Sequence, residues 1–388
     1  MTTQAAAKEL IARLVAFDTT SHLSNVPIMD FIRDYLARHG VESTLLPDET
    51  GEKVNLFATI GPLDRPGVAL SGHTDCVPVI GQPWDTPPFT CTQKDGLLYG
   101  RGTCDMKGFV AICLAMVPRF IEAPLLTPIH LVFSYDEEIG CTGVRPMIEK
   151  LGTDLPLPKA VIVGEPTGME VVDAHKGISD FSTEIIGHES HSSMDLVAGN
   201  ALVAGARFIG ELMRLREQYV SRGDASGRFV PPYTSIHAGQ INAGTATNIV
   251  PRRCEIGWEV RSLPEHKSTD VADAMADFCA RELLPVLQAA SPDTYIETVM
   301  KVDAPGLAPD PGSLAETLAK RLSGHNDTHT VSYATEAGLF QLAGSPTVVC
   351  GPGGIAQAHR PNEYISLAQV DTCLQFMEKL AQTCRAGL

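Results

Sequence analysis

The chain has 388 residues, more than one ordinary core requires, and this length predicts about two to three domains. An apolar content of 44% with 6% aromatic residues is typical of a globular α/β protein. The formal net charge is -16, and no basic stripe occurs along the chain. Nucleic acid is therefore excluded as an expected partner, because phosphate binding requires clustered lysine and arginine.

The apolar runs and the cysteines indicate the compartment. No run approaches the roughly 18 residues that a membrane-spanning helix needs, so no membrane partner is expected. Residues 1–17 have the pattern of an amphipathic helix rather than of a signal peptide. The ten cysteines form no C-x-x-C pair, and several lie inside apolar runs. We therefore expect reduced, buried thiols and a cytoplasmic protein.

The first half of the chain alternates between strand and helix patterns. Two helices are expected within residues 4–40, separated by a stretch of capping residue types at 18–21. The following elements are strands 41–46, 54–60 and 67–71, helix 108–120, strand 129–134, helix 143–151 and strand 160–163. This alternation predicts an α/β fold with a mostly parallel sheet and helices on both faces.

The pattern changes near residue 178. The next elements are strand 178–186, helix 198–219, strands 234–241 and 253–261, helix 268–289 and strand 294–302. The order β-α-β-β-α-β predicts an inserted ferredoxin-like α+β domain at 179–304. The α/β pattern returns with helix 313–323, strand 347–350 and helix 367–384. A catalytic α/β domain is thus expected in two parts, 1–178 and 305–388.

Acidic and histidine side chains lie at or beyond the ends of the predicted strands of the α/β domain. The positions are His73 with Asp75, Asp105 in the glycine-rich turn 100–108, Asp136 with Glu137 and Glu138, Glu165, and His359. A single such residue is more often a turn or cap residue than a ligand, and adjacent acids usually form a solvated loop. Their gathering at one edge of one sheet, where such folds bind ligands, favours a metal site.

The residue types restrict the metal. Two histidines with three or four carboxylates suit one or two zinc ions, with cobalt or manganese as alternatives. His73, Asp105, Glu138, Glu165 and His359 provide three ligands to each of two ions if one carboxylate bridges them. Such a pair lowers the pKa of a shared water and polarises a carbonyl group. A further carboxylate is then needed as general base, and Glu137 stands beside Glu138.

Five segments resemble the M20 family of dinuclear zinc peptidases and deacylases, namely 71–75, 100–108, 136–138, 164–167 and the late His359. The resemblance covers essentially the whole chain in order. It implies that Asp105 bridges the two ions, with His73 and Glu165 at one and Glu138 and His359 at the other.

The resemblance also implies supporting roles around the two ions. Asp75 would hold the ring of His73 through its second nitrogen. Glu137 would accept a proton from the attacking water and later donate it to the leaving amine. The family has a cis peptide after the bridging aspartate, so one is expected between Asp105 and Met106.

The inserted domain resembles the smaller lid or dimerisation domain of the family, which implies a homodimer. His191 matches a histidine that stabilises the oxyanion, although by itself it would be a surface histidine at a strand end. Asn248 and Arg261 resemble substrate-binding positions. A guanidinium suits the α-carboxylate of an amino-acid substrate, and the alternative for Arg261 is a pair with a neighbouring glutamate. Gly353 and Gly354 would line the pocket through backbone groups.

Within the family, the greatest likeness is to the deacetylases of N-acetyl-L-ornithine. The implied function is hydrolysis of an N-acyl amino acid, first of all N-acetyl-L-ornithine in arginine biosynthesis. Succinyl-diaminopimelate desuccinylase, another aminoacylase and a carboxypeptidase are the alternatives with the same chemistry. A non-catalytic binding protein is disfavoured because every predicted ligand and Glu137 are present, and a serine hydrolase is disfavoured because no G-x-S-x-G occurs.

Overall fold

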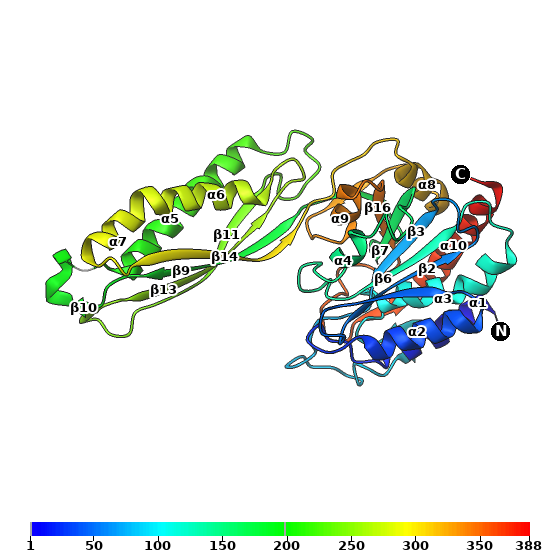
Figure 1. Ribbon diagram of the computed structural model, residues 1–388. Coiled ribbons are helices and arrows are strands. Elements are labelled where there is room, and N and C mark those ends of the chain that lie inside the picture. Colours follow the sequence, from blue (N-terminus) through cyan, green and yellow to red (C-terminus); the bar gives the residue numbers. More distant parts are fainter. Residues whose placement is uncertain (1, 198) are drawn as a thin grey trace. The chain divides into compact units, whose positions relative to one another are not determined.

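The computed structural model describes residues 2–197 and 199–388, which form two compact units (Figure 1). The first unit contains the residues up to 174 together with 307–329 and 335–388. The second unit contains residues 175–306 and 330–334. The chain therefore passes from the first unit into the second and back twice.

An eight-stranded sheet organises the first unit, with the strand order β1-β2-β6-β3-β7-β16-β8-β15. Its strands are β1 (Ser43–Pro47), β2 (Val54–Ile60), β3 (Val68–His73), β6 (Ile129–Ser134), β7 (Ala160–Pro166), β8 (Val172–His175), β15 (His329–Val331) and β16 (Thr347–Gly351). The neighbours β6, β3, β7 and β16 run parallel, whereas β1, β2 and β8 pair antiparallel. The predicted α/β class with a largely parallel sheet is confirmed.

Seven helices accompany this sheet in the described part of the first unit. They are α1 (Thr3–Val15), α2 (Val26–Arg38), α3 (Lys107–Glu122), α4 (Arg145–Ile148), α8 (Leu314–Ser323), α9 (Ala337–Leu342) and α10 (Leu367–Ala386). The strands β3 and β6 are buried along their whole length, which explains their continuous apolar runs.

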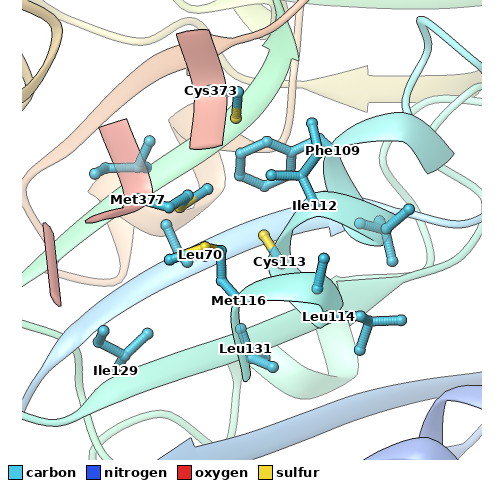
Figure 2. Packing of buried hydrophobic residues seen from close by; sticks show 14 of the residues in the cluster. Leu70, Phe109, Ile112, Cys113, Leu114, Met116, Ile129, Leu131, Cys373 and Met377 are labelled. Atoms are coloured by element: carbon cyan, nitrogen blue, oxygen red, sulfur yellow. The ribbon is translucent and has the colours of Figure 1, made fainter. Parts of the chain in front are cut away.

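The two faces of the sheet pack against different helices. Leu70 and Leu131 lie in one apolar core with Phe109 of α3 and Met377 of α10 (Figure 2). Burying each such side chain stabilises the fold by about 1.5–3 kcal/mol. Ser71, one residue after Leu70, and Ser134, three residues after Leu131, point to the opposite face, because successive strand residues alternate. Both hydroxyls donate there to Glu336, which immediately precedes α9.

A small sheet aligns two segments that are far apart in the sequence. It consists of β4 (Thr92–Lys94), β5 (Leu97–Tyr99) and β17 (Tyr364–Ser366), in the order β17-β5-β4. Tyr364 pairs with Tyr99 in an antiparallel register. The turn that follows β5 and the turn that precedes β17 are therefore adjacent.

The second unit is an antiparallel sheet with the order β11-β13-β9-β14, covered by helices on one face (Figure 1). Its elements are β9 (Ile178–Ile186), β10 (Ser190–His191), α5 (Ala201–Arg222), β11 (Ser235–Ala243), β12 (Ile249–Val250), β13 (Arg253–Arg261), α6 (Ser268–Phe278), α7 (Leu284–Ala290) and β14 (Tyr295–Ala304). Trp258 stacks on Phe181 with ring centroids 4.1 Å apart. The four main strands and their helices have the predicted ferredoxin-like order.

Three predicted helix bounds differ from the structure. The helix expected at 143–151 shortens to α4, because tight turns around Gly152, with a φ of +81°, follow it. The helix expected at 268–289 contains a π-turn at 279–283, since Pro285 lacks an N–H and its ring clashes with the preceding turn. The expected start at Ala198 lies outside the described residues. Helix α5 begins at Ala201, where the side chain of Asn200 caps the N–H of Val203.

All ten cysteines are free thiols, and nine of them are buried. Among the described helices, none combines the length and apolarity that crossing a bilayer requires. The peptide bond between Asp105 and Met106 is cis, as expected from the family pattern.

Candidate metal centre

The strands that carry the candidate ligands are neighbours in the sheet. His73 is the last residue of β3, Glu165 lies near the end of β7, and Glu138 follows the end of β6. Strand β3 lies between β6 and β7, so the chain connections diverge on its two sides. Because these strands are parallel, their carboxyl ends meet at one edge, where doubly wound sheets bind ligands.

Asp105 lies between two imidazole rings at this edge. Its Oδ1 is 3.1 Å from Nε2 of His73, and its Oδ2 is 3.3 Å from Nε2 of His359. The carboxylate thus presents one oxygen to each histidine. A bridging ligand between two ions has this geometry.

Each histidine also contacts a glutamate. Nε2 of His73 lies 3.6 Å from Oε1 of Glu165, and Nε2 of His359 lies 2.9 Å from Oε2 of Glu138. The structure therefore brings together all five residues predicted as ligands. They form two groups, one around each histidine, and Asp105 belongs to both.

A metal ion has enough donor atoms in two overlapping places. The ligand atoms of His73, Asp105 and Glu138 lie within 4.8 Å of one another, and so do those of His73, Glu137 and Glu165. Glu137 is therefore within the same cluster as the predicted ligands. Assignment of the individual ions remains a prediction.

Asp75 orients both the His73 ring and the adjoining loop. Nδ1 of His73 lies 3.1 Å from the carbonyl oxygen and 3.4 Å from Oδ1 of Asp75. The carboxylate also accepts hydrogen bonds from the backbone N–H groups of Glu137 at 3.1 Å and Glu138 at 3.3 Å. When Nδ1 donates its proton to Asp75, the lone pair of Nε2 is available to a metal.

The buried acids shift one another's titration. Burial and the charge of Asp105 raise the pKa of Glu165 well above its usual range, and they also raise the pKa of Glu138. Burial opposes the ionisation of Asp105, but hydrogen bonds from His359 and His73 hold its pKa below the usual range. The raised pKa values of Glu138 and Glu165 thus result from the crowding of negative charge in a space of low polarity.

The imidazoles are affected in the opposite direction. Burial disfavours the charged form of His73, but the carboxylates of Glu165 and Asp105 raise its pKa well above the ordinary value. Hydrogen bonds to Asp105 and Glu138 raise the pKa of His359 to about 10. Divalent cations would replace the protons held here, because carboxylate and neutral imidazole are the ligating forms.

Two oxygen atoms test whether cations fit this site. Oε1 of Glu138 and Oε1 of Glu165 are buried and have no hydrogen-bond donor among the described residues. A buried oxygen without a donor is costly unless another positive group satisfies it. Together with hard oxygen and imidazole ligands, these atoms fit one or two divalent ions.

Glu137 is the carboxylate predicted as general base. The thiol of Cys141 donates to its Oε1, with a sulfur–oxygen distance of 3.4 Å. Burial and the neighbouring charges of Glu138 and Glu336 raise the pKa of Glu137 well above its usual range. A base with a raised pKa holds a proton more readily between its acceptance and its donation.

Gly353 and Gly354 lie against the residue that precedes Asp105. Gly353 has a φ of +84°, and a Cβ atom added there would stand 2.5 Å from Sγ of Cys104. The thiol of Cys104 contacts the carbonyl oxygen of Gly354 at 3.5 Å. Only glycine fits this close approach, whereas a contact with substrate remains a prediction.

The other predicted substrate residues belong to the second unit. His191 is exposed, and its Nδ1 lies 2.8 Å from the hydroxyl of Ser193. The carbonyl oxygen of Asn248 accepts the N–H of Ser192. Arg261 pairs with Glu259 at 3.1 Å, which is the contact of the simpler alternative. Their roles toward substrate remain predictions.

Two buried glutamates near the centre received no role from the sequence. Glu336 accepts hydrogen bonds from Ser134 at 2.5 Å and Ser71 at 3.4 Å, and burial raises its pKa to about 7. Glu363 pairs with Arg101 at 2.7 Å. In the sequence, each is a single acid in a short connecting segment. The signals that could have suggested a role are that Glu336 immediately precedes an apolar helix and that Glu363 follows His359 by four residues.

Comparison with known proteins reveals the relatives of this chain. The model of Peptidase family M20/M25/M40 matches residues 69–383. An acetylornithine deacetylase from Proteus mirabilis is 32% identical over 379 residues, covering 97% of this chain and 95% of that protein. An acetylornithine deacetylase from Myxococcus xanthus is 35% identical over 378 residues, covering 95% of this chain and 94% of that protein.

Solved structures share the fold across nearly the whole chain. The M20 family metallo-carboxypeptidase Sso-CP2 from Sulfolobus solfataricus gives a TM-score of 0.75 at 18% identity, covering 98% of this chain and 99% of that one. The Bacillus subtilis YXEP protein, named a dinuclear metal binding peptidase from the M20 family, gives 0.65 at 18% identity, covering 100% and 99%.

The fold and the cluster of ligand-type side chains, together with these relatives, define a metal-dependent amidohydrolase. The chain belongs to the M20/M25/M40 peptidase family. The resemblance inferred from the sequence motifs is thereby confirmed.

Proposed function

We propose that this chain hydrolyses the amide bond of N-acetyl-L-ornithine, releasing L-ornithine and acetate. The position of Asp105 between His73 and His359 carries the proposal of a metal-dependent hydrolase. The substrate is supported by the two acetylornithine deacetylases that match almost the whole chain. No observation favours the desuccinylase alternative.

The proposed centre would hold two divalent ions, with zinc preferred and cobalt as the alternative. Asp105 would be shared by both ions, His73 and Glu165 would hold one, and Glu138 and His359 would hold the other. When bound, the pair supplies electrophilic polarisation of the scissile carbonyl and acidifies water. Asp75 keeps the His73 ring in the tautomer that can ligate.

Glu137 performs the proton transfers in this proposal. Its carboxylate removes a proton from the attacking water and later donates that proton to the departing amine. Water thus supplies oxygen to the acyl group, which leaves as acetate, and hydrogen to the nitrogen of ornithine. His191 donates toward the negative charge that develops on the carbonyl oxygen.

The remaining residues recognise the substrate. Arg261 binds the α-carboxylate through its guanidinium, and Asn248 provides a further polar contact. Gly353 and Gly354 line the pocket through backbone groups. We also propose that residues 179–304 act as a lid and as the contact of a homodimer, and that the protein acts in the cytoplasm in arginine biosynthesis.

A substrate panel tests the proposal. The protein, loaded with zinc or with cobalt, is assayed with N-acetyl-L-ornithine, N-succinyl-diaminopimelate, N-acetyl derivatives of neutral amino acids and dipeptides. We expect the highest kcat/KM for N-acetyl-L-ornithine. Rapid desuccinylation without cleavage of N-acetyl-L-ornithine would overturn the substrate assignment. The variant Glu137→Ala controls for contaminating hydrolases.

A further inference from the structure

A buried ion pair connects the two loops that carry Asp105 and His359. Nη1 of Arg101 lies 2.7 Å from Oε2 of Glu363, and the side chains are only 1% and 0% exposed. Arg101 stands four residues before Asp105, and Glu363 stands four residues after His359. Neither side chain belongs to the proposed set of ligands.

Glu363 fixes the backbone of the loop that contains Asp105. Its Oε1 accepts the N–H of Cys104 at 2.8 Å and the N–H of Asp105 at 3.0 Å. Its second oxygen is the one that pairs with Arg101. The carboxylate therefore holds Asp105 at its own backbone nitrogen while it is itself held by a guanidinium.

Arg101 extends the connection to the backbone of His359. Its Nη2 donates to Oε1 of Gln82 at 2.6 Å, and Nε2 of Gln82 donates to the carbonyl oxygen of His359 at 2.9 Å. The guanidinium also lies over the ring of Trp84, 5.2 Å from the centroid. The side chain is thus fixed on several sides.

The strand register strengthens this alignment. The N–H of Gly100 donates to the carbonyl oxygen of Glu363 at 2.9 Å, next to the pair formed by Tyr99 and Tyr364. The loop that follows β5 and carries Asp105 therefore starts at a fixed position. The loop that carries His359 likewise ends at a fixed position, where β17 begins. A shift of one loop would break the sheet pairing and the ion pair together.

Net stability does not explain a buried charge pair. Removing two charges from water costs several kcal/mol, and apolar residues of similar volume often do as well or better. What this pair provides is a fixed geometry, because a carboxylate and a guanidinium constrain both the distance and the angle between them. Through this pair, the backbone of Asp105 is held at a fixed position relative to the backbone of His359.

We infer that Arg101 and Glu363 are positioning residues that hold Asp105 in register with His359, and so set the affinity for the cation bound by His359. This inference rests on the proposed function, because it assumes that the two loops carry metal ligands. The pair acts through the ligands, so the readout must be metal binding rather than turnover alone.

Cobalt titration of the metal-free protein tests the inference. The variant Glu363→Gln keeps the shape and one acceptor oxygen but leaves Arg101 without its counter-charge. We expect wild type to bind two Co²⁺ ions. In the variant, the ion at His359 should bind about 10- to 100-fold more weakly, while the other ion, which shares only Asp105 with it, should be weakened less. Calorimetry measures the two affinities, and the visible absorption of Co²⁺ reports the geometry around each ion.

A matched control is available on α8. Glu316 is a buried carboxylate that accepts the N–H of Gly312 and pairs with Lys320, each at 2.5 Å, and it lies outside the metal cluster. The variant Glu316→Gln therefore removes a charge pair that is partly exposed, with side chains 27% and 10% accessible, and that lies far in the sequence from every proposed ligand. We expect it to bind both cobalt ions with wild-type affinity.

Further variants keep the test decisive if Glu363→Gln folds poorly. Arg101→Lys retains the charge but loses the planar fork, and the double variant Arg101→Gln with Glu363→Gln replaces the ion pair with a neutral pair. We expect a smaller loss of cobalt affinity in both than in Glu363→Gln. Thermal unfolding of each metal-free variant separates folding from metal affinity.

The possible outcomes separate the inference from the proposed function. If each ion binds to Glu363→Gln with the same affinity as to wild type, even when the melting temperature of the variant is lower, the inference is overturned and the metal centre stays intact. Binding of fewer than two ions by wild type would instead overturn the dinuclear centre. An error in the substrate assignment would leave the cobalt titration unchanged.

Discussion

The thiol of Cys141 donates a hydrogen bond to Oε1 of Glu137, across 3.4 Å and four residues of sequence. This contact orients one oxygen of the predicted base. The carboxylate reaches the cluster of His73 and Glu165. The base is therefore held by a neutral donor rather than by a cation, and it keeps the ability to accept a proton.

Replacing Glu137 tests its role. We expect Glu137→Ala to lower kcat by about 10²- to 10⁴-fold, because proton transfer in the transition state is lost. Two metal ions should remain bound, since the five proposed ligands are intact. Steady-state kinetics and metal analysis on the same sample measure both quantities. An unchanged kcat would refute the assignment.

Removal of metal should destabilise the first unit. Without cations, the carboxylates of Asp105, Glu138 and Glu165 repel one another in a buried space, and this repulsion adds to burial in raising the pKa values of Glu138 and Glu165. We expect a chelator to abolish activity and lower the melting temperature, and added zinc or cobalt to restore both. A ligand at a hundred times its Kd contributes about 2.7 kcal/mol to folding.

The chelator experiment has its own control. The variant Asp105→Asn removes the bridging charge, so its melting temperature should respond much less to chelator. If wild type melts at the same temperature with and without chelator, no tightly held cation stabilises the fold.

Arg261 distinguishes substrate binding from a surface ion pair. If the guanidinium binds the α-carboxylate, Arg261→Ala should raise KM about tenfold to a hundredfold, the cost of a charge-assisted hydrogen bond. Arg253, on the same strand, pairs with Glu184 and Glu255 and serves as the matched control. An identical KM for wild type, Arg261→Ala and Arg253→Ala would leave only the pair with Glu259.

His130 makes the first unit sensitive to acid. The imidazole is buried in β6, where its Nε2 accepts the N–H of Gly67 and its Nδ1 contacts the hydroxyl of Thr59. Burial lowers its pKa to about 4 from the ordinary 6.5. Between these values the unfolded chain binds a proton that the folded protein does not. Stability is therefore full above pH 6.5 and falls as the pH decreases toward 4, by at most about 3 kcal/mol.

The variant His130→Gln should flatten this dependence, because glutamine does not titrate and its oxygen can accept the N–H of Gly67. Urea unfolding at pH 7 and pH 5, with chelator present to exclude metal loss, measures the difference. The exposed His22, changed to glutamine, is the control and should leave the slope as in wild type. A wild-type slope in His130→Gln would show that other groups cause the acid sensitivity.

The central strands β3, β6 and β7 of the first unit were predictable because they are buried on both faces. The apolar runs that end at His73 and Ser134 predict central strands, which are buried on both faces. The polar residues at the ends of these strands could therefore be recognised as candidate site residues. Their gathering at one edge follows from parallel pairing, so the convergence of His73, Glu138 and Glu165 could be anticipated from chain order.

Other features could not be read from the sequence. His359 follows its strand by a long turn, so its distance from the strand end weakened the pattern, and the resemblance to a family supported its place in the site. Glu363 and Glu336 act through contacts with distant residues, which local patterns do not encode. The π-turn before Pro285 depends on how the helix accommodates a missing N–H. Strand order likewise depends on long-range pairing.

The return of residues 330–334 to the second unit restricts how that unit can be exchanged between proteins. The hydroxyl of Thr330 donates to the carbonyl oxygen of Arg228 at 2.6 Å, and the N–H of Lys176 donates to Val331 at 3.4 Å. A gene fragment for residues 175–306 would omit the hydroxyl of Thr330 and the carbonyl oxygen of Val331, and would leave their partners on Arg228 and Lys176 without these bonds. A chimera built at the two obvious junctions would therefore graft an incomplete module, and recombination that preserves folding must also carry the short distal segment.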